Sequence, residues 1–208
     1  MRILSLCDYT GNMLKPWAEA GHECVAVDLA QDNPGFRDGI NYVCADVFSY
    51  SVDEPFDYVF AFPPCTDLAV SGARWWEQKG IRATIESLQL VEACLTICKT
   101  ATKSWMIENP VGRLSSAWRK PDYTFDPCDY GDPYTKKTCL WVGGDFIMPE
   151  KAPVEPVRVC AQGSWLQQLG GKSEKTKRLR STTPMGFACL PRKRITANHP
   201  AGGRHGLT

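Results

Sequence analysis

The sequence is poor in histidine and lacks the paired ligands of a zinc site. Only three of its 208 residues are histidine, and none of its ten cysteines belongs to a Cys-x-x-Cys pair. A structural zinc ion needs four Cys or His ligands at short spacings, so we expect no metal site. Most of the cysteines stand in apolar runs, where a thiol behaves as a small hydrophobic side chain. We expect reduced, mostly structural cysteines, as in a cytoplasmic protein.

The chain also lacks long apolar runs and an excess of charge of one sign. No run approaches the roughly 20 apolar residues that span a membrane, and we recognise no secretory signal. Hydrophobic residues make up 43% of the chain and charged residues 23%, which is ordinary for a globular domain. The formal net charge is +1, so charge alone neither favours nor excludes a polyanionic partner. We expect a globular protein that does not associate with membranes.

Short β-rich runs alternate with helical stretches over the first two-thirds of the chain. Strands are predicted at 2–7, 24–29, 42–45, 58–62, 105–107 and 138–142, and helices at 13–20 and 81–101. The segment Glu108-Asn109-Pro110 is expected to end the strand at 105–107. This alternation predicts an α/β fold with a doubly wound, mainly parallel sheet. In such sheets ligands bind beyond the carboxyl ends of the strands.

A tight turn and two acids follow the first three predicted strands. The turn Asp8-Tyr9-Thr10-Gly11 leads into a helix, which is typical of nucleotide-type cofactor sites. Asp28 ends the second strand, where a carboxylate accepts hydrogen bonds from a ribose diol, and Asp46 follows the third, within reach of an adenine amino group. Each acid alone is more often a surface turn residue or a helix cap. Their order together predicts an adenosyl cofactor.

A stiff turn that carries a thiol, Phe62-Pro63-Pro64-Cys65, follows the apolar run 58–61. The two prolines fix the backbone and remove two donors, so the strand ends abruptly and presents Cys65 at the mouth of the cleft. A cysteine acts as a nucleophile when nearby positive charge favours its thiolate, and a sulfonium cofactor supplies such charge. The alternative is a structural cysteine in a tight turn.

Glu108 stands 43 positions after Cys65, beside the next predicted strand. A carboxyl group near a thiol and apolar residues is expected to have a raised pKa and to donate a proton. C5 of cytosine becomes nucleophilic once a thiolate adds at C6, and an acid that hydrogen-bonds the ring N3 helps this addition. Cys65 and Glu108 together therefore predict methyl transfer to C5 of cytosine.

The order of these motifs resembles the catalytic domain of DNA cytosine-C5 methyltransferases, with their Pro-Pro-Cys nucleophile and Glu-Asn-Val acid. It looks closest to small phage and prophage members, which follow Pro-Pro-Cys with a Ser-Gly-Ala-Arg like that at 71–74. The resemblance covers most of residues 2–142. It implies a class I S-adenosylmethionine-dependent (Rossmann-like) fold, S-adenosyl-L-methionine as cofactor, and DNA as partner. The implied cofactor-binding positions are Asp8, Tyr9, Thr10, Gly11, Asp28, Leu29, Asp46, Val47, Phe62 and Pro64.

The chain departs from the family pattern at several positions. Tyr9 stands where the cofactor loop usually has glycine, and Pro110 replaces the valine after Glu-Asn. Tyr134, Lys136 and Thr138 stand where Gln, Arg and Arg are expected. We expect Lys136 to join the catalytic residues, contacting a pyrimidine carbonyl as a point charge rather than as a planar fork.

The part of the chain after residue 145 is too short for a large target-recognition domain. We divide the chain into a catalytic domain at 1–145, a small irregular Pro/Gly-rich and basic region at 146–196, and a flexible tail at 197–208. Residues 172–194 contain eight basic residues and one acid. The predicted DNA contacts are Ser71, Arg74, Lys177, Arg178 and Arg180. We expect low or short-range sequence selectivity on single- or double-stranded DNA.

Several alternatives stay open at this stage. The same chemistry can act on a free cytosine nucleotide, or a modified sulfonium cofactor can donate another group. A non-catalytic accessory or decoy protein that binds cofactor or DNA is a third alternative, and a partner subunit or a homodimer is compatible with each. A DNA amino-methyltransferase is less favoured, because those enzymes place Asp or Asn before Pro-Pro and an aromatic residue after it. If the chain is phage-encoded, it acts in the host cytoplasm.

Overall fold

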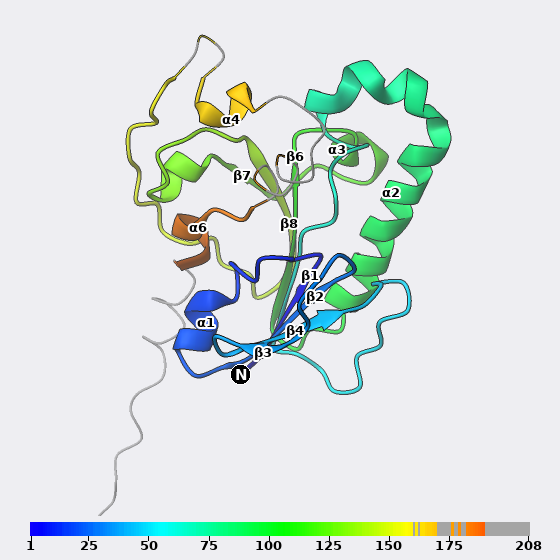
Figure 1. Ribbon diagram of the computed structural model, residues 1–208, viewed down its shortest axis with the longest axis vertical. Helices are drawn as coiled ribbons and strands as arrows, with labels where there is room; N and C mark the ends of the chain where they lie inside the picture. Colours follow the sequence, from blue (N-terminus) through cyan, green and yellow to red (C-terminus); the bar gives the residue numbers. More distant parts are fainter. Residues whose placement is uncertain (160, 162, 170–175, 177–178, 180–181, 190–208) are drawn as a thin grey trace, which may run out of the picture.

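A mixed, eight-stranded sheet with strand order β3-β4-β2-β1-β5-β6-β8-β7 forms the centre of the molecule (Figure 1). The computed structural model describes residues 1–159, 161, 163–169, 176, 179 and 182–189. The strands are β1 (Arg2–Leu6), β2 (Glu23–Asp28), β3 (Gly35–Arg37), β4 (Ile40–Cys44), β5 (Tyr58–Ala61), β6 (Ser104–Pro110), β7 (Tyr123–Phe125) and β8 (Thr138–Gly144). The five strands β4, β2, β1, β5 and β6 run parallel, which confirms the expected mainly parallel α/β sheet.

The chain changes direction across the sheet at its centre. From β1 it moves outward to β2 and β4, and it then returns to place β5 on the other side of β1 and β6 beyond β5. Ligands of open α/β sheets bind in the crevice at such a switch point, outside the carboxyl ends of the strands. The loops that follow β1 and β5 border this crevice. They are the turn at 8–11 and the turn at 62–65.

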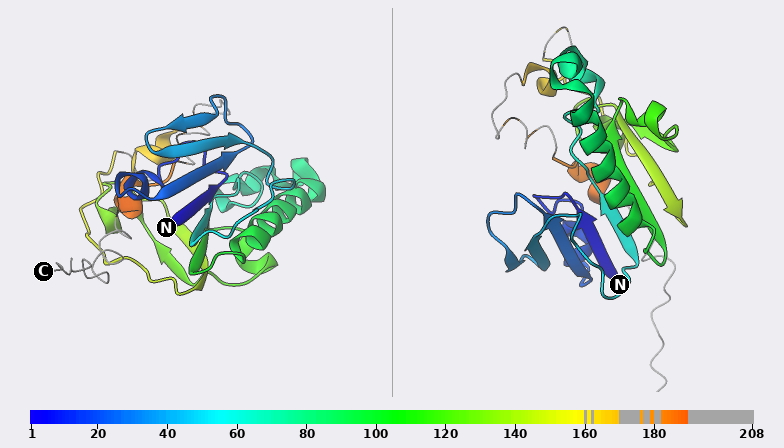
Figure 2. Two further views of the ribbon diagram at one scale, coloured as in Figure 1. Left: turned by 90° about the horizontal axis from the view of Figure 1, so that it is seen from below. Right: turned by 90° about the vertical axis from the view of Figure 1, so that its right-hand side faces the viewer.

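Helices cover both faces of the sheet (Figure 2). On one face, α2 (Trp76–Cys98) packs over a core that includes Leu4 and Val59. On the other, α1 (Lys15–Glu19) and α6 (Met185–Cys189) lie over a core that includes Ile3 and Phe60. Successive side chains of a strand point to opposite faces, which explains why neighbours in sequence belong to different cores. The doubly wound arrangement is therefore confirmed.

Helix α2 begins five residues before the expected start at 81 and extends beyond the sheet. Its 23 residues rise about 34 Å, whereas the four residues of β5 span about 13 Å. The first part of its apolar stripe consequently has no core to cover: Ile81 is 78% and Ile85 is 47% exposed, while Val91 is buried. Gly80, with φ 71° and ψ 176°, interrupts the helix near its start.

The expected end of the strand at 105–107 is wrong. β6 continues through Glu108, Asn109 and Pro110. Its parallel pairing with β5 stops at Ala61–Ile107, but its antiparallel pairing with β8 continues to Pro110–Thr138. Proline is tolerated there because it is the last residue of the strand. The sequence analysis also missed β3 and β7, because three-residue, largely exposed strands leave no apolar pattern.

Part of the region expected to be irregular contributes to the core. The ring of Phe187 in α6 stacks on Phe125 at 4.5 Å between centroids and meets Tyr130 edge-on at 5.4 Å. Gly186 N donates a hydrogen bond to an Asp132 carboxylate oxygen at 2.7 Å. Residues 182–189 are thus docked on the sheet face that carries α1. The proposed domain limits remain a prediction, and the tail at 197–208 lies outside the described residues.

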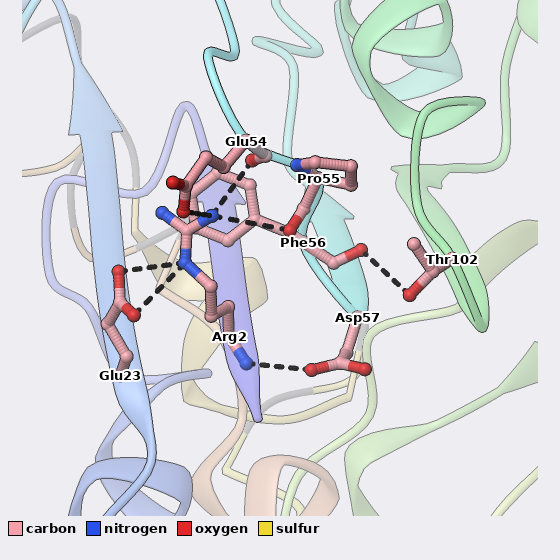
Figure 3. A network of polar contacts seen from close by, with 7 residues as sticks. All are labelled: Arg2, Glu23, Glu54, Pro55, Phe56, Asp57 and Thr102. Carbon is pink, nitrogen blue, oxygen red and sulfur yellow. Dashed lines mark hydrogen bonds and ion pairs between the residues drawn. The ribbon is translucent and has the colours of Figure 1, made fainter.

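A polar network closes the amino end of the sheet (Figure 3). Arg2 Nε donates to both carboxylate oxygens of Glu23 at 3.0 Å, and its Nη1 donates to the Glu54 carbonyl at 3.0 Å. The backbone amide of Arg2 donates to Asp57 at 2.9 Å, and the guanidinium lies 4.6 Å from the Phe56 ring centroid. These contacts join β1, β2 and the segment that leads into β5. The turn at 8–11 and the turn that carries Cys65 lie at the opposite, carboxyl end.

No helix in the described part of the chain has the length and apolar character to cross a membrane. Within the same residues, no group of three or more His, Cys, Asp or Glu side chains is arranged to hold a metal ion.

Candidate functional site

The buried carboxylate of Asp8 organises the turn after β1. Its Oδ1 accepts hydrogen bonds from Gly11 N at 2.8 Å and from Thr10 Oγ1 at 3.1 Å, and its Oδ2 accepts one from Ser5 Oγ at 2.8 Å. Burial raises the pKa of Asp8, and the hydrogen bonds from Ser5, Thr10 and Gly11 oppose that rise. Asp8 therefore shapes the loop from inside.

Gly11 is required by the shape of this turn. Its φ is +65°, and a Cβ at this position would lie 2.5 Å from the hydroxyl of Tyr42 on β4. The same hydroxyl donates to the Thr10 carbonyl at 3.3 Å. Tyr42 thus supports the loop from the neighbouring strand, a role that the sequence analysis missed because a tyrosine in a short apolar run carries no motif.

Tyr9 joins the turn after β1 to the loop after β2. Its hydroxyl donates to the Asp32 carboxylate, with oxygen–oxygen distances of 2.8 and 2.9 Å. Gln31, which is buried, donates its side-chain amide to the Tyr9 carbonyl at 3.2 Å. The Tyr9 side chain is therefore held by the β2–β3 loop.

The two acids at the ends of β2 and β4 lie beside exposed apolar side chains. Asp28 Oδ1 accepts from Ala30 N at 2.7 Å, and Asp46 Oδ1 accepts from Phe48 N at 3.0 Å. Leu29 is 67% and Phe48 is 61% exposed, whereas Val47 is buried. Carboxylates next to open apolar surface fit an adenosyl group, which has a hydroxyl-rich ribose and a flat apolar base.

The turn that carries Cys65 is tied to β6. Asn109, which is fully buried, donates its side-chain amide to the Pro63 carbonyl at 2.9 Å. The Cys65 carbonyl accepts from Leu68 N at 3.0 Å and from Ala69 N at 2.8 Å, so the chain turns immediately after the thiol. Pro64 is exposed and the Cys65 side chain is half-buried. The thiol is positioned by β5 behind it and by Asn109 from the next strand.

The segments that follow Cys65 and Glu108 run side by side. Val70 N donates to the Val111 carbonyl at 2.9 Å, and Arg113 N donates to the Leu68 carbonyl at 2.8 Å. A Cβ on Gly112 would lie 2.0 Å from the Leu68 carbonyl oxygen, so only glycine allows this approach. The backbone therefore brings together the two segments that hold the predicted nucleophile and the predicted acid.

Glu108 lies on the same face of β6 as Met106, the face that carries α1 and α6. Its Oε1 is 3.8 Å from Lys136 Nζ, and the side chains of both residues are largely buried, with 16% and 18% exposed. The same Oε1 is buried without a hydrogen-bond partner among the described residues. The Thr138 hydroxyl donates to the Lys136 carbonyl at 2.7 Å and fixes the chain that carries this lysine. The structure thus places Lys136 next to Glu108.

The predicted DNA contacts are only partly described. Ser71 and Arg74 are exposed on the 3-10 helix η1 (Val70–Trp75), and the Arg74 guanidinium lies 5.1 Å from the Trp75 ring centroid. Lys177, Arg178 and Arg180 lie outside the described residues. An open hollow of about 700 Å³ separates the start of α2 from α3 (Leu114–Ala117), with Trp76 and Arg113 in its wall. None of the predicted catalytic residues lines it.

The cysteines Cys7, Cys94 and Cys98 are structural. The Sγ atoms of Cys7 and Cys94 are 4.0 Å apart. The hydrogen bond with Cys94 and burial both raise the pKa of the Cys7 thiol, and burial raises that of Cys98. The Cys7 and Cys98 thiols therefore stay protonated, and all three cysteines belong to or pack against the core under α2.

No family model matches the chain, and no curated protein is similar to it in sequence. Solved structures resemble parts of it. Magnesium protoporphyrin IX methyltransferase from Synechocystis, with bound S-adenosylmethionine, has a TM-score of 0.39 and 11% identity over 67% of this chain and 68% of that one. The glycopeptide N-methyltransferase MtfA with S-adenosylhomocysteine has a TM-score of 0.32 and 14% identity over 72% and 59% of the two chains. An S-adenosylmethionine-dependent methyltransferase from Clostridium acetobutylicum has a TM-score of 0.31 and 13% identity over 70% and 67%. At these scores the matches identify neither a family nor a substrate.

Proposed function

We propose that this chain transfers a methyl group from S-adenosylmethionine to C5 of cytosine in DNA, with Cys65 as the nucleophile and Glu108 as the acid. One observation carries the proposal. The Glu108 carboxyl has a buried oxygen without a hydrogen-bond partner in the described chain, beside Lys136 and on a strand tied to the Cys65 turn. A buried oxygen without a hydrogen bond is costly even beside a lysine, and a ligand that hydrogen-bonds it at this place lowers the cost.

The cofactor side of the crevice is formed by the turn at 8–11 and by the ends of β2 and β4. Asp28 and Asp46 offer carboxylate oxygens to a ribose and to an adenine amino group, and Leu29 offers an apolar surface. Bound S-adenosylmethionine supplies an electrophilic methyl group on a sulfonium centre. The position of the turn at 8–11 at the switch point, next to the Cys65 turn, supports this use of the site.

On this proposal the residues of the chain act in sequence on the pyrimidine. The Cys65 thiolate forms a bond to C6, while the Glu108 carboxyl hydrogen-bonds N3 and the exocyclic amine, and Lys136 faces the C2 carbonyl. The resulting electron-rich C5 takes the methyl group as the methyl–sulfur bond breaks, and S-adenosylhomocysteine leaves. A base then removes the C5 proton, and the C6–S bond breaks to return the thiolate.

The test is release of tritium from DNA labelled at C5 of cytosine, which reports loss of the C5 proton. Wild-type protein with S-adenosylmethionine is expected to release tritium, and Cys65→Ser is expected to release none. Glu108→Gln is expected to lower the rate by about 10²- to 10⁴-fold, since it removes the acid and keeps the shape. Cys24→Ser is the matched control, because Cys24 lies near the start of β2, at the amino end of the sheet, and takes no part in the proposed chemistry. Cofactor binding by the wild type with no tritium release from any cytosine substrate would overturn the proposal.

A further inference from the structure

A short aromatic pair lies next to Glu108 and Lys136, on the part of the chain after β8. Trp165 is the first residue of α4 (Trp165–Gln168), and its ring meets that of Tyr134 edge-to-face, with centroids 5.5 Å apart and 61° between planes. Tyr134 stands two residues before Lys136. Trp165 therefore contacts a residue of the loop that carries the candidate catalytic lysine.

The position of Trp165 is fixed by its neighbours. Ser164, which is 1% exposed, donates its hydroxyl to the Thr135 carbonyl at 3.3 Å. Val157 N donates to the Pro133 carbonyl at 2.9 Å. The segment before α4 is thus attached at two points to residues 133–135, on either side of Tyr134. Leu166 is buried, while Trp165 itself keeps 39% of its surface exposed.

Tyr134, one member of this aromatic pair, interacts electrostatically with Glu108. Burial raises the pKa of Tyr134, and the negative charges of Asp132 and Glu108 raise it further. The phenol consequently stays neutral and lies within electrostatic range of the Glu108 carboxyl. Figure 1 shows α4 at the same end of the molecule as α3, the start of α2 and the end of β6.

We propose that Trp165 is a stacking platform for a nucleobase of single-stranded DNA, next to the cytosine held by Glu108 and Lys136. The inference rests on the proposed function for the position of that cytosine. Every base has a π-face, so an open indole braced from one side binds bases with little sequence preference. Duplex bases are already stacked on each other, and the platform therefore selects an unpaired strand.

The experiment measures binding of a fluorescein-labelled, single-stranded oligonucleotide with one cytosine by fluorescence anisotropy. Trp165→Leu is expected to raise the dissociation constant about 5- to 150-fold, the range given by loss of one base–aromatic stack. Trp165→Phe keeps an aromatic face and is expected to retain most of the affinity. Trp118→Leu is the matched control: Trp118 is 36% exposed and stacks on Trp141, which belongs to the core under α2 on the opposite face from Glu108. This control is expected to bind within about twofold of the wild type.

Three outcomes would overturn the platform. These are no oligonucleotide binding by the wild type, an unchanged dissociation constant in Trp165→Leu, or an equal loss in the Trp118→Leu control. A fourth comparison uses deoxycytidine monophosphate, which has no neighbouring base. The dissociation constant for deoxycytidine monophosphate is expected to be the same in the wild type and in Trp165→Leu. A rise in Trp165→Leu as large as the rise seen with the oligonucleotide would show that Trp165 holds the reacting base instead.

Tritium release on the same samples separates this inference from the proposed function. Oligonucleotide binding that depends on Trp165, without any tritium release, would support the stacking platform and refute the cytosine chemistry. If the rate of tritium release at a subsaturating oligonucleotide concentration is the same in Trp165→Leu as in the wild type, the stacking platform is refuted and the cytosine chemistry is supported. Circular dichroism and thermal unfolding of each variant confirm that the comparison is made on folded protein.

Discussion

Removing the Asn109 side chain tests whether a single buried hydrogen bond positions the Cys65 turn. In the wild type, Asn109 Nδ2 donates to the Pro63 carbonyl at 2.9 Å, and the Asn109 side chain is fully buried. Asn109→Ala removes this donor and leaves the carbonyl before Pro64-Cys65 unpaired. The turn then loses its only side-chain hydrogen bond to β6 among the described residues.

The expected magnitude follows from the two polar atoms of Asn109. Leaving the buried Pro63 carbonyl unsatisfied costs about 1–3 kcal/mol. Asn109 Oδ1 is itself buried without a hydrogen-bond partner in the described part of the chain, so its removal offsets part of this loss of stability. We expect a net loss of about 1–2 kcal/mol in the free energy of unfolding, measured by urea denaturation.

The functional effect of Asn109→Ala is expected to be larger than its effect on stability. A nucleophile displaced by about 1 Å loses roughly 10²-fold in rate. Among the described residues, no hydrogen bond joins Asn109 to the turn at 8–11, which we propose to bind the cofactor. Tritium release should therefore fall by roughly 10- to 100-fold, while the affinity for S-adenosylhomocysteine, measured by calorimetry, stays within about twofold. An unchanged rate in a variant that has lost the expected stability would refute the reasoning, because Asn109 would then stabilise the fold without positioning Cys65.

Three further predictions concern the loop, the sheet edge and the thiols. Gly11→Ala should lose about 1–2 kcal/mol of stability from its positive φ alone, and more from the clash with the Tyr42 hydroxyl, so adding Tyr42→Phe should restore part of the thermal stability. For Asp57, burial raises the pKa, but hydrogen bonds from a backbone amide and a lysine outweigh burial and hold the pKa below its ordinary value. A lowered carboxyl pKa stabilises the fold above its unfolded value of about 4, so the stability deficit of Asp57→Asn should be present at neutral pH and should disappear in urea titrations as the pH falls through the lowered pKa of Asp57. Burial raises the pKa of Cys98, so peptide mapping after iodoacetamide should find the exposed Cys44 alkylated and Cys98 unmodified in native protein.

The parallel sheet was predictable because its central strands are short apolar runs that end in conspicuous polar or proline residues. The run that ends at Phe62-Pro63-Pro64-Cys65 is the clearest example, since proline stops a strand at a known residue. The end of β6 was not predictable in the same way. Glu108 and Asn109 look like strand-ending residues, but β8 pairs with them, and pairing between strands about 30 residues apart leaves no local signal.

Residues of the candidate site were predictable where they belong to a sequence motif. Residues that only support the site by packing were not. Cys65 and Glu108 stand in recognisable segments, and the structure ties those segments together through Asn109 and Gly112. Tyr42 and Trp165 are single aromatic residues without a motif, so only three-dimensional contacts reveal their positions beside the candidate site. The exposure of the first half of α2 was also not predictable. An apolar stripe shows which face of a helix packs on a sheet, but it does not show how far the sheet extends beneath that helix.

The most direct test of the account is mass spectrometry of the protein after incubation with S-adenosylmethionine and DNA that contains 5-fluorocytosine. Fluorine at C5 cannot leave as a proton does, so the C6–S bond formed by the nucleophile persists. The account predicts a covalent adduct that maps to Cys65 in the wild type and in the Cys24→Ser control, and that is absent in Cys65→Ser. An adduct at another residue, or no adduct despite measured cofactor and DNA binding, would contradict it.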